Sequence, residues 1–167
     1  MSDLDALRAQ LERIATLAAG PLPSAPGVSA WSAAQHLDHV LRVGTGMLKR
    51  IAKPSEEAMP PLDWRGRLVL TLGWIPRGKG KSPDALVGQE VTSDALAASH
   101  RRCAEALQIV ADRPVLLAAR APVMRHPYFG GLTAAQTVRF ARIHTDHHLK
   151  IVGEILAAAS GRTVRPG

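Results

Sequence analysis

The sequence contains a single cysteine, Cys103, among 167 residues. One cysteine cannot form an intramolecular disulfide, and the cysteine ligand sets of many structural zinc sites are excluded as well. Any metal ion would therefore have to be bound by histidine and carboxylate side chains. Cys103 lies in a predicted helix, with no helix N-terminus nearby to lower its pKa. We interpret it as a small buried hydrophobic residue rather than a nucleophile.

Aromatic residues are also scarce, at 4% of the chain. The net charge of +7 and the isoelectric point of about 10.5 raise the question of nucleic acid. A base-stacking surface needs aromatic side chains, however, and the basic residues here are scattered. The one local run, RGKGK at residues 77–81, lacks the spacing of a phosphate-binding P-loop and is predicted to be a solvated loop. We therefore expect no nucleic-acid partner, and a charge that attracts small acidic substrates or maintains solubility.

Long apolar runs are missing too. No stretch reaches the roughly 18 apolar residues that a membrane-spanning helix needs, and the opening MSDLDALRAQ does not resemble a signal peptide. We therefore expect a cytoplasmic protein without a membrane partner. A length of 167 residues with 46% hydrophobic residues predicts one domain, 1–167, that buries its own core.

Helix signals are clear in four regions. Apolar residues recur every three or four positions, and three regions open with a capping box, at Ser2 with Asp5, Ser32 with Gln35 and Thr133 with Gln136. These patterns predict helices over residues 3–19, 32–53, 93–112 and 133–159. A short helix over 62–74 and loops are predicted between the second and third of these, and no convincing strand pair is found. The predicted fold class is all-α, a four-helix bundle.

The most informative stretch is RFARIHTDHHLKIVGEIL, residues 139–156. As a helix it aligns one apolar face, made of Phe140, His144, His148, Ile151 and Ile155. His147 points toward the polar side, where Asp146 also falls. Burying an unpaired polar group costs about 1–3 kcal/mol, so two histidines in an apolar stripe need partners.

Two interpretations of His144 and His148 are open at this point. Histidines one helical turn apart can both offer a ring nitrogen to one metal ion, as in zinc-binding helices. Alternatively, they are core histidines hydrogen-bonded to neighbouring groups. On the helix at 32–53, His36 lies at the edge of the apolar face and His39 about 60° further out, given about 100° per residue. Periodicity alone therefore favours His36 as the inward-facing group.

Trp31-Ser32 is followed by His39, and a late helix carries His144 and His148 as HxxxH. This combination resembles the DinB-like superfamily of four-helix-bundle proteins. The closer resemblance is to a branch in which HPxFGxLT precedes HxDHH, here HPYFGGLT at residues 126–133 and HTDHH at residues 144–148. The matching motifs span about residues 30–50 and 125–156. Leu149 and Lys150 depart from the residues that many relatives have there.

The resemblance implies a divalent metal ion, zinc or nickel, bound by three histidines. The family's single early histidine corresponds to His39 and its HxxxH pair to His144 and His148, in conflict with the helical wheel. We follow the family spacing and keep His36, His126, His147 and Asp146 as alternative ligands or as residues that support the ligands. Three imidazoles leave a coordination position for a water or substrate, which is typical of catalytic metal sites.

Relatives in this superfamily include transferases and isomerases that use a low-molecular-weight thiol. The resemblance therefore implies a metal-dependent transferase whose partners are a small-molecule substrate and such a thiol. A metal-dependent hydrolase is a second interpretation, although no HExxH motif supplies a partner glutamate. A non-catalytic protein that binds a metal or a small ligand is the third. A homodimer is compatible with each of them.

Overall fold

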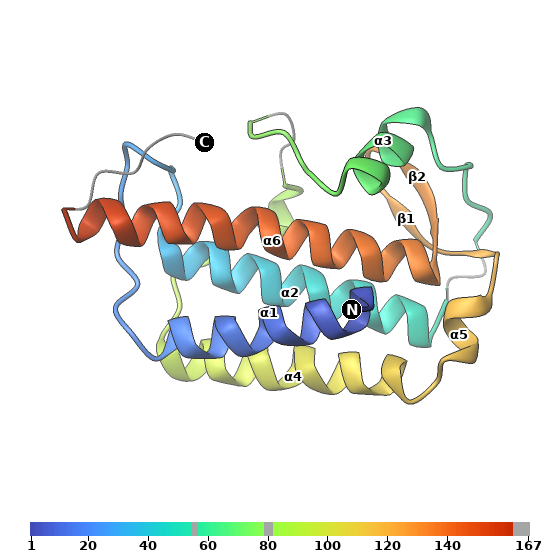
Figure 1. Ribbon diagram of the computed structural model, residues 1–167, viewed down its shortest axis with the longest axis horizontal. Helices are drawn as coiled ribbons and strands as arrows, with labels where there is room; N and C mark the ends of the chain where they lie inside the picture. Colours follow the sequence, from blue (N-terminus) through green and yellow to red (C-terminus); the bar gives the residue numbers. More distant parts are fainter. Residues whose placement is uncertain (55–56, 79–81, 162–167) are drawn as a thin grey trace.

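The computed structural model describes residues 1–54, 57–78 and 82–161. Four long helices form the body of the molecule (Figure 1). Their bounds are Asp3–Ala18 for α1, Ala33–Ala52 for α2, Ser93–Ala111 for α4 and Ala134–Ala159 for α6. Each lies within one or two residues of its predicted range. The all-α fold class and the four predicted helices are confirmed.

The helix starts follow from local hydrogen bonding. The three predicted capping boxes are all formed: the N-cap side chains of Ser2, Ser32 and Thr133 each accept a hydrogen bond from the backbone N–H three residues later. In each case the residue at that third position returns the bond to the N-cap backbone. These reciprocal bonds satisfy two N–H groups that a helix start otherwise leaves unpaired. They fix where α2 and α6 begin and hence which residues face inward.

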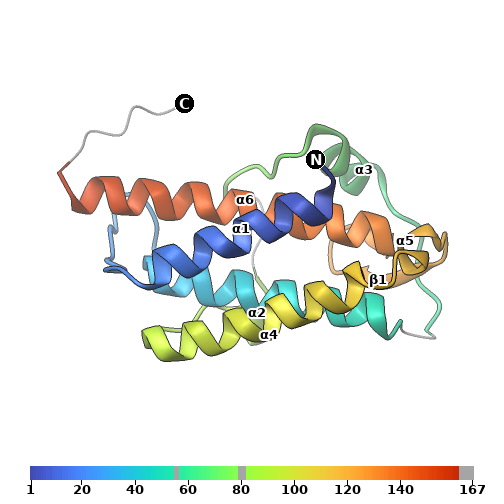
Figure 2. The same ribbon diagram turned by 60° about the horizontal axis from the view of Figure 1, so that its bottom comes forward.

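The four helices pack as a bundle in which α1 and α6 run one way and α2 and α4 the other (Figures 1 and 2). Helix α6, orange to red, packs against both α1 and α2, and α4 packs against the same two helices on the opposite side of the bundle. Helices α2 and α6 are thus direct neighbours, although the chain between them includes α4 and every short element. The core of the bundle is made of fully buried aliphatic side chains, among them Leu7, Ile14, Leu37, Leu41, Leu48, Ile51, Leu96 and Ile155.

The chain between α2 and α4 crosses back along the bundle, on the side of α2 and α6. It contains the predicted short helix, α3, at Trp64–Leu72, and a 3-10 turn, η1, at Asp84–Leu86. After α4 comes a four-residue helix, α5, at Val115–Ala118. These segments cover one face of the α2–α6 pair, which becomes important for the site.

The prediction of no strand pair is wrong. Strands β1, Pro122–His126, and β2, Gly130–Thr133, form an antiparallel hairpin directly before α6. The second strand is short and begins with two glycines, so it carries little strand signal in the sequence. Gly130 has a left-handed φ of +86°, and a Cβ there would lie 2.4 Å from the Pro61 carbonyl oxygen. Only glycine fits this position, where the hairpin packs tightly on the segment before α3.

In the described part of the chain, no helix is both long enough and apolar enough to cross a membrane.

Candidate metal centre

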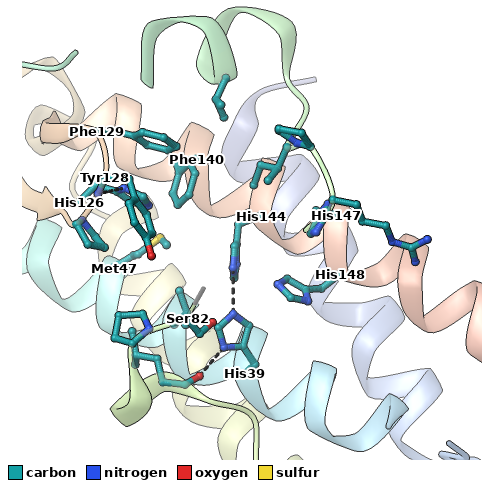
Figure 3. A pocket seen from close by; sticks show the side chains of 18 of the residues that line it. His39, Met47, Ser82, His126, Tyr128, Phe129, Phe140, His144, His147 and His148 are labelled. Carbon is teal, nitrogen blue, oxygen red and sulfur yellow. Dashed lines mark hydrogen bonds between the residues drawn. The ribbon is translucent and has the colours of Figure 1, made fainter. Parts of the chain in front are cut away.

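Three histidines meet between α2 and α6. One ring nitrogen from each of His39, His144 and His148 lies within 4.8 Å of the other two. Figure 3 shows the His39 ring pointing from α2 toward the two α6 rings, which stand one helical turn apart. We call this group the histidine trio. Its three members come from the two helices that the topology places side by side, although 105 residues separate His39 from His144.

The orientation of His39 is fixed by the segment that crosses over it. Its Nδ1 lies 2.6 Å from the carbonyl oxygen of Leu86. A carbonyl only accepts, so Nδ1 carries the ring proton and donates it, and Nε2 of the neutral ring has a free lone pair. That Nε2 faces the trio, 3.1 Å from Nε2 of His144. Such a bond to a backbone carbonyl is how proteins orient metal-binding histidines.

His148 is oriented in the same way by a second chain of hydrogen bonds. Nδ1 of His148 lies 2.8 Å from Nδ1 of His36, and Nε2 of His36 lies 2.9 Å from Oγ of Ser29. The Ser29 oxygen also accepts a bond from the Trp31 backbone N–H. One consistent assignment has His36 donating from Nε2 to Ser29 and accepting at Nδ1 from His148. The Nε2 of His148 is then also a free lone pair.

The separation within the trio suits a metal ion. Two nitrogens bound to one zinc ion at about 2.0–2.1 Å in tetrahedral geometry lie about 3.3 Å apart. The Nε2 atoms of His39 and His144 are 3.1 Å apart. Without an ion, Nε2–H of His144 donates a hydrogen bond to Nε2 of His39. The donor set of three imidazoles therefore fits a divalent transition-metal cation.

Burial keeps these imidazoles neutral. It lowers the pKa of His36 to about 4 and holds the pKa values of His144 and His148 well below their usual range, where neighbouring imidazoles add to the effect. Burial also lowers the pKa of His39, and the bond to Leu86 partly offsets it. Neutral imidazole is the form that binds metal ions, so around pH 7 the protons do not compete strongly for the lone pairs.

The helical wheel was right about His36 and wrong about His39. Both side chains are buried, each 3% exposed, but His39 belongs to the trio and His36 contacts it from outside, through His148. The wheel places His39 outward because it considers only the apolar periodicity of one helix and not the segments that pack on it. The segment at residues 84–89, which we call the strap, covers that outer face of α2 and encloses His39.

The other three candidate residues differ in how close they come to the trio. His147 is partly buried, with its ring centroid 5.2 Å from that of His148. His126, on β1, stacks on Phe129 with centroids 4.1 Å apart and reaches His144 only through Phe140. Asp146 instead pairs with Lys150 at 2.8 Å, on the outer side of α6. The structure therefore does not bring Asp146 to the site.

Sequence reasoning missed the residues that fasten the strap to α2. The buried carboxylate of Asp38 accepts a bond from the Gln89 backbone N–H at 2.9 Å. Arg42 pairs with Asp38 at 3.3 Å and donates to the carbonyl oxygens of Ala85 and Val87. The one available signal is that an acidic residue adjoins His39 and is followed four positions later by an arginine.

Two further residues close the site in ways that the sequence did not reveal. At Gly88 a Cβ would lie 2.1 Å from the carbonyl oxygen of Gln35, so only glycine lets the strap approach the start of α2 this closely. The indole of Trp31 covers the imidazoles from the other side, with ring centroids 5.3 Å from His36, 5.1 Å from His39 and 6.3 Å from His148. In the sequence, Trp31 was recognised only as part of the family motif with Ser32 and His39.

A cavity of about 1560 Å³ opens beside the histidines. All three members of the trio line it, and so do His36, His126 and His147. Its walls come from α2, α3, α6, the hairpin and the strap. Of the basic run at residues 77–81, Arg77 lines the cavity and pairs with Glu154 at 2.8 Å. Residues 79–81, for which a solvated loop is predicted, lie outside the described residues.

Cys103 is 1% exposed, and burial raises the pKa of its thiol to about 11. The interpretation of this residue as a buried hydrophobic side chain is confirmed, and within the protein it supplies no thiolate for the site.

One of three comparisons with known proteins found a match. Neither the curated proteins nor the solved structures gave a match. A family model described as the DinB superfamily matches residues 3–152, which covers α1 through most of α6 and includes the whole trio. A match over this much of the chain shows that the protein belongs to the DinB superfamily.

Proposed function

We propose that this protein is a metal-dependent enzyme in which His39, His144 and His148 bind one divalent ion, zinc or nickel. The observation that supports it most strongly is the pair of outer hydrogen bonds. His39 and His148 each use Nδ1 in a hydrogen bond, with Leu86 and His36 respectively, and so keep Nε2 out of these bonds. A pair of ordinary core histidines would not need both free nitrogens to face the same point.

The chain's own residues prepare this site in three ways. The strap holds His39 in one tautomer, and the Ser29–His36 chain of hydrogen bonds orients the His148 ring. The Trp31 indole packs against these rings, edge-on to His39 and stacked on His148, and so limits the access of water on that side. The cavity gives a small molecule access to the remaining side of the trio. A divalent ion bound by three protein ligands would supply Lewis-acid chemistry at an open position.

Among the reactions open to such a site, we propose group transfer with a low-molecular-weight thiol. The described residues that line the cavity include no cysteine, so the thiol would enter as a co-substrate. A hydrolase is less well supported. Its usual partner is a carboxylate close to the metal, and Asp84 is the sole carboxylate among the described lining residues. Asp84 has no hydrogen bond or ion pair with the trio.

The direct test is metal stoichiometry, measured by elemental analysis of protein purified without a metal-affinity tag. We expect close to one divalent ion per chain in the unmodified protein. His144→Ala leaves two imidazoles and should lose most of the metal, and His39→Ala and His148→Ala should do the same. His100→Ala is the matched control, since its Nε2 contacts the carbonyl oxygen of Leu11, outside the site.

A variant of His36, which supports His148, should give an intermediate loss of metal binding. His36→Ala removes the acceptor for His148 and should weaken metal binding by about 10–100-fold without abolishing it. Circular dichroism should show that each variant keeps the helical content, since the apolar core holds the bundle together. Full metal content in a His144→Ala, His148→Ala double variant would disprove the metal centre. One bound ion without turnover of thiols and electrophiles would instead indicate a non-catalytic metal-binding protein.

A further inference from the structure

All six aromatic residues of this aromatic-poor chain line the same cavity. The sequence has three tryptophans, one tyrosine and two phenylalanines, and every one of them belongs to the cavity wall: Trp31, Trp64, Trp74, Tyr128, Phe129 and Phe140. Figure 3 shows Phe129, Phe140 and Tyr128 grouped on one side of His144, so the aromatic wall extends away from the trio. A bundle core does not require this arrangement, because aliphatic residues fill the core here.

Much of this apolar wall is left open to solvent. Large apolar side chains that are about half exposed or more include Trp64 at 68%, Leu72 at 61%, Trp74 at 55%, Tyr128 at 52% and Leu68 at 49%, and all of these line the cavity. Exposed apolar groups that gather at one concave site mark a binding surface more often than a structural one. Helix α3 supplies three of them on one face, at steps of four residues.

The charges around the cavity are nearly all positive. The described lining residues include five arginines, Arg42, Arg50, Arg65, Arg77 and Arg125, against one carboxylate, Asp84. Arg42 and Arg77 already pair with Asp38 and Glu154. Arg50, Arg65 and Arg125 form no ion pair with any described residue. Arginine binds carboxylates through two parallel hydrogen bonds, which suits an anionic ligand.

The spacing along α2 separates the metal end of the cavity from the cationic end. The α2 residues that line it include His36, His39, Val43, Met47 and Arg50, which recur every three or four positions along one face, and Arg42 and Gly46 lie beside them. With a rise of 1.5 Å per residue, Arg50 lies about 16 Å along the helix axis from His39. Two apolar lining residues, Val43 and Met47, lie between them along the helix. A ligand that spans this length would meet imidazoles first, then aromatic rings, then arginine.

The hairpin adds a hydrogen-bond donor to the same wall. The backbone N–H of Tyr128 donates to Nδ1 of His126 at 3.2 Å, so the proton of the neutral ring is on Nε2. Among the described residues, no acceptor is paired with that Nε2. His126 therefore presents an N–H to the cavity next to Phe129, where a ligand oxygen would accept it.

We infer that the cavity binds a small aromatic molecule that carries a carboxylate, with the ring system against the aromatic wall and the carboxylate at Arg50 and Arg125. This inference rests on the proposed function for its catalytic meaning, since it names the class of substrate that would lie beside the metal centre. The binding itself depends on groups outside the trio. It can therefore be tested with and without metal.

The test is isothermal titration calorimetry with three probes: 2-naphthoate, its neutral amide 2-naphthamide, and acetate. The naphthoate should bind, the amide should bind at least about tenfold more weakly because it lacks the charge, and acetate should give no measurable heat. Arg50→Gln and Arg125→Gln should each weaken naphthoate binding by about 3–10-fold and leave amide binding unchanged. Arg101→Gln, on the exposed face of α4 and away from the cavity, is the matched control.

The aromatic wall is tested by Trp64→Ala, a residue exposed enough that its loss should not affect folding. This variant should weaken binding of naphthoate and amide alike. Equal affinity for naphthoate and amide, no binding of either, or unchanged binding in the arginine variants would each overturn the inference. A concentration-dependent dimer that Trp64→Ala dissociates would also overturn it, because a second copy would then occupy the wall.

Repeating the titrations on protein treated with a chelator, and on His144→Ala, separates this inference from the proposed function. If naphthoate still binds there with the same dependence on Arg50 and Arg125, the ligand class is supported whatever the metal analysis shows. If metal binds stoichiometrically and naphthoate does not bind, the metal centre is supported and the ligand class is wrong.

Discussion

The two sides of the bundle treat histidine differently. On the side where α1 packs on α4, His100 lies among aliphatic residues, and its Nε2 contacts the carbonyl oxygen of Leu11 at 3.0 Å. One backbone acceptor satisfies it, and nothing further is needed. On the side where α2 packs on α6, His39 and His148 also have hydrogen-bond partners at Nδ1, and in addition one ring nitrogen of each lies within 4.8 Å of a ring nitrogen of His144.

The difference teaches which buried histidines indicate a site. A partner at one ring nitrogen is common to both sides, so satisfaction of a single hydrogen bond does not distinguish them. What distinguishes the α2–α6 side is that free lone pairs from separate helices converge, beside a cavity. A shared cation satisfies such a group. We therefore predict that the stability of the bundle depends mainly on the α1–α4 side, whereas metal binding depends on the α2–α6 side.

The largest effect is expected from a cavity made in the core. Ile14→Ala on α1 removes most of a fully buried side chain and should lower the free energy of unfolding by about 2–5 kcal/mol. Denaturant unfolding followed by circular dichroism measures it. Metal content per folded molecule should stay the same. A loss of metal from the still-folded variant would show that the two sides are coupled, contrary to the comparison.

A smaller effect, confined to the metal side, is expected from Gly88→Ala. The new Cβ would lie 2.1 Å from the Gln35 carbonyl oxygen, so the strap must move and carry Leu86 away from His39. Losing this orienting bond should weaken metal binding by about 10–100-fold, as measured by competition with a chromophoric chelator. Gly27→Ala, where a Cβ would meet nothing within 4 Å, is the control. Equal affinity in the two variants would show that the strap does not orient His39.

Cys103 allows a test of burial that does not involve the metal side. Its pKa is raised to about 11, so folding favours the protonated thiol. Between its ordinary value of 9 and about 11 the unfolded chain loses this proton first. Stability should therefore fall with rising pH, by up to about 1.4 kcal/mol per unit. In Cys103→Ala this contribution disappears, so the difference in stability between the two proteins should shrink over that window. A constant difference would contradict the raised pKa.

The smallest expected effect is a gain in the free energy of unfolding. Gly153 lies inside α6, and a Cβ there would meet nothing within 4 Å. Gly153→Ala should therefore raise the free energy of unfolding by about 0.5–1 kcal/mol through helix propensity alone. Metal affinity should not change, since Gly153 is more than one helical turn beyond His148. A thermal melt detects the gain, and a destabilised variant would mean that α6 packs more tightly here than the structure shows.

The parts of the fold that sequence reasoning predicted are those set by neighbouring residues. Capping boxes such as Thr133 with Gln136 involve residues three apart, and the alignment of His144 with His148 needs only the helical period. Both could be read from one stretch of chain. The family motif added His39, which periodicity alone had placed outward.

The parts that were missed depend on contacts between distant residues. The bond from His39 to Leu86 joins residues 47 apart, and that from His36 to His148 joins residues 112 apart. No local pattern encodes where a crossing segment will lie, so the strap and its fastening by Arg42 could not be predicted. The hairpin was missed for the same reason. Gly130 is required by its contact with the distant Pro61, whereas in the sequence alone a glycine indicates only a turn.

The gathering of Trp31, Trp64 and Trp74 around one cavity also has a spectroscopic consequence. The chain has no other tryptophan, so its intrinsic fluorescence comes from the cavity wall rather than from the aliphatic core. Emission intensity and wavelength therefore report on the solvent and ligands in the cavity, while far-ultraviolet circular dichroism reports on the bundle. The protein thus carries two optical signals, each tied to a different part of its structure.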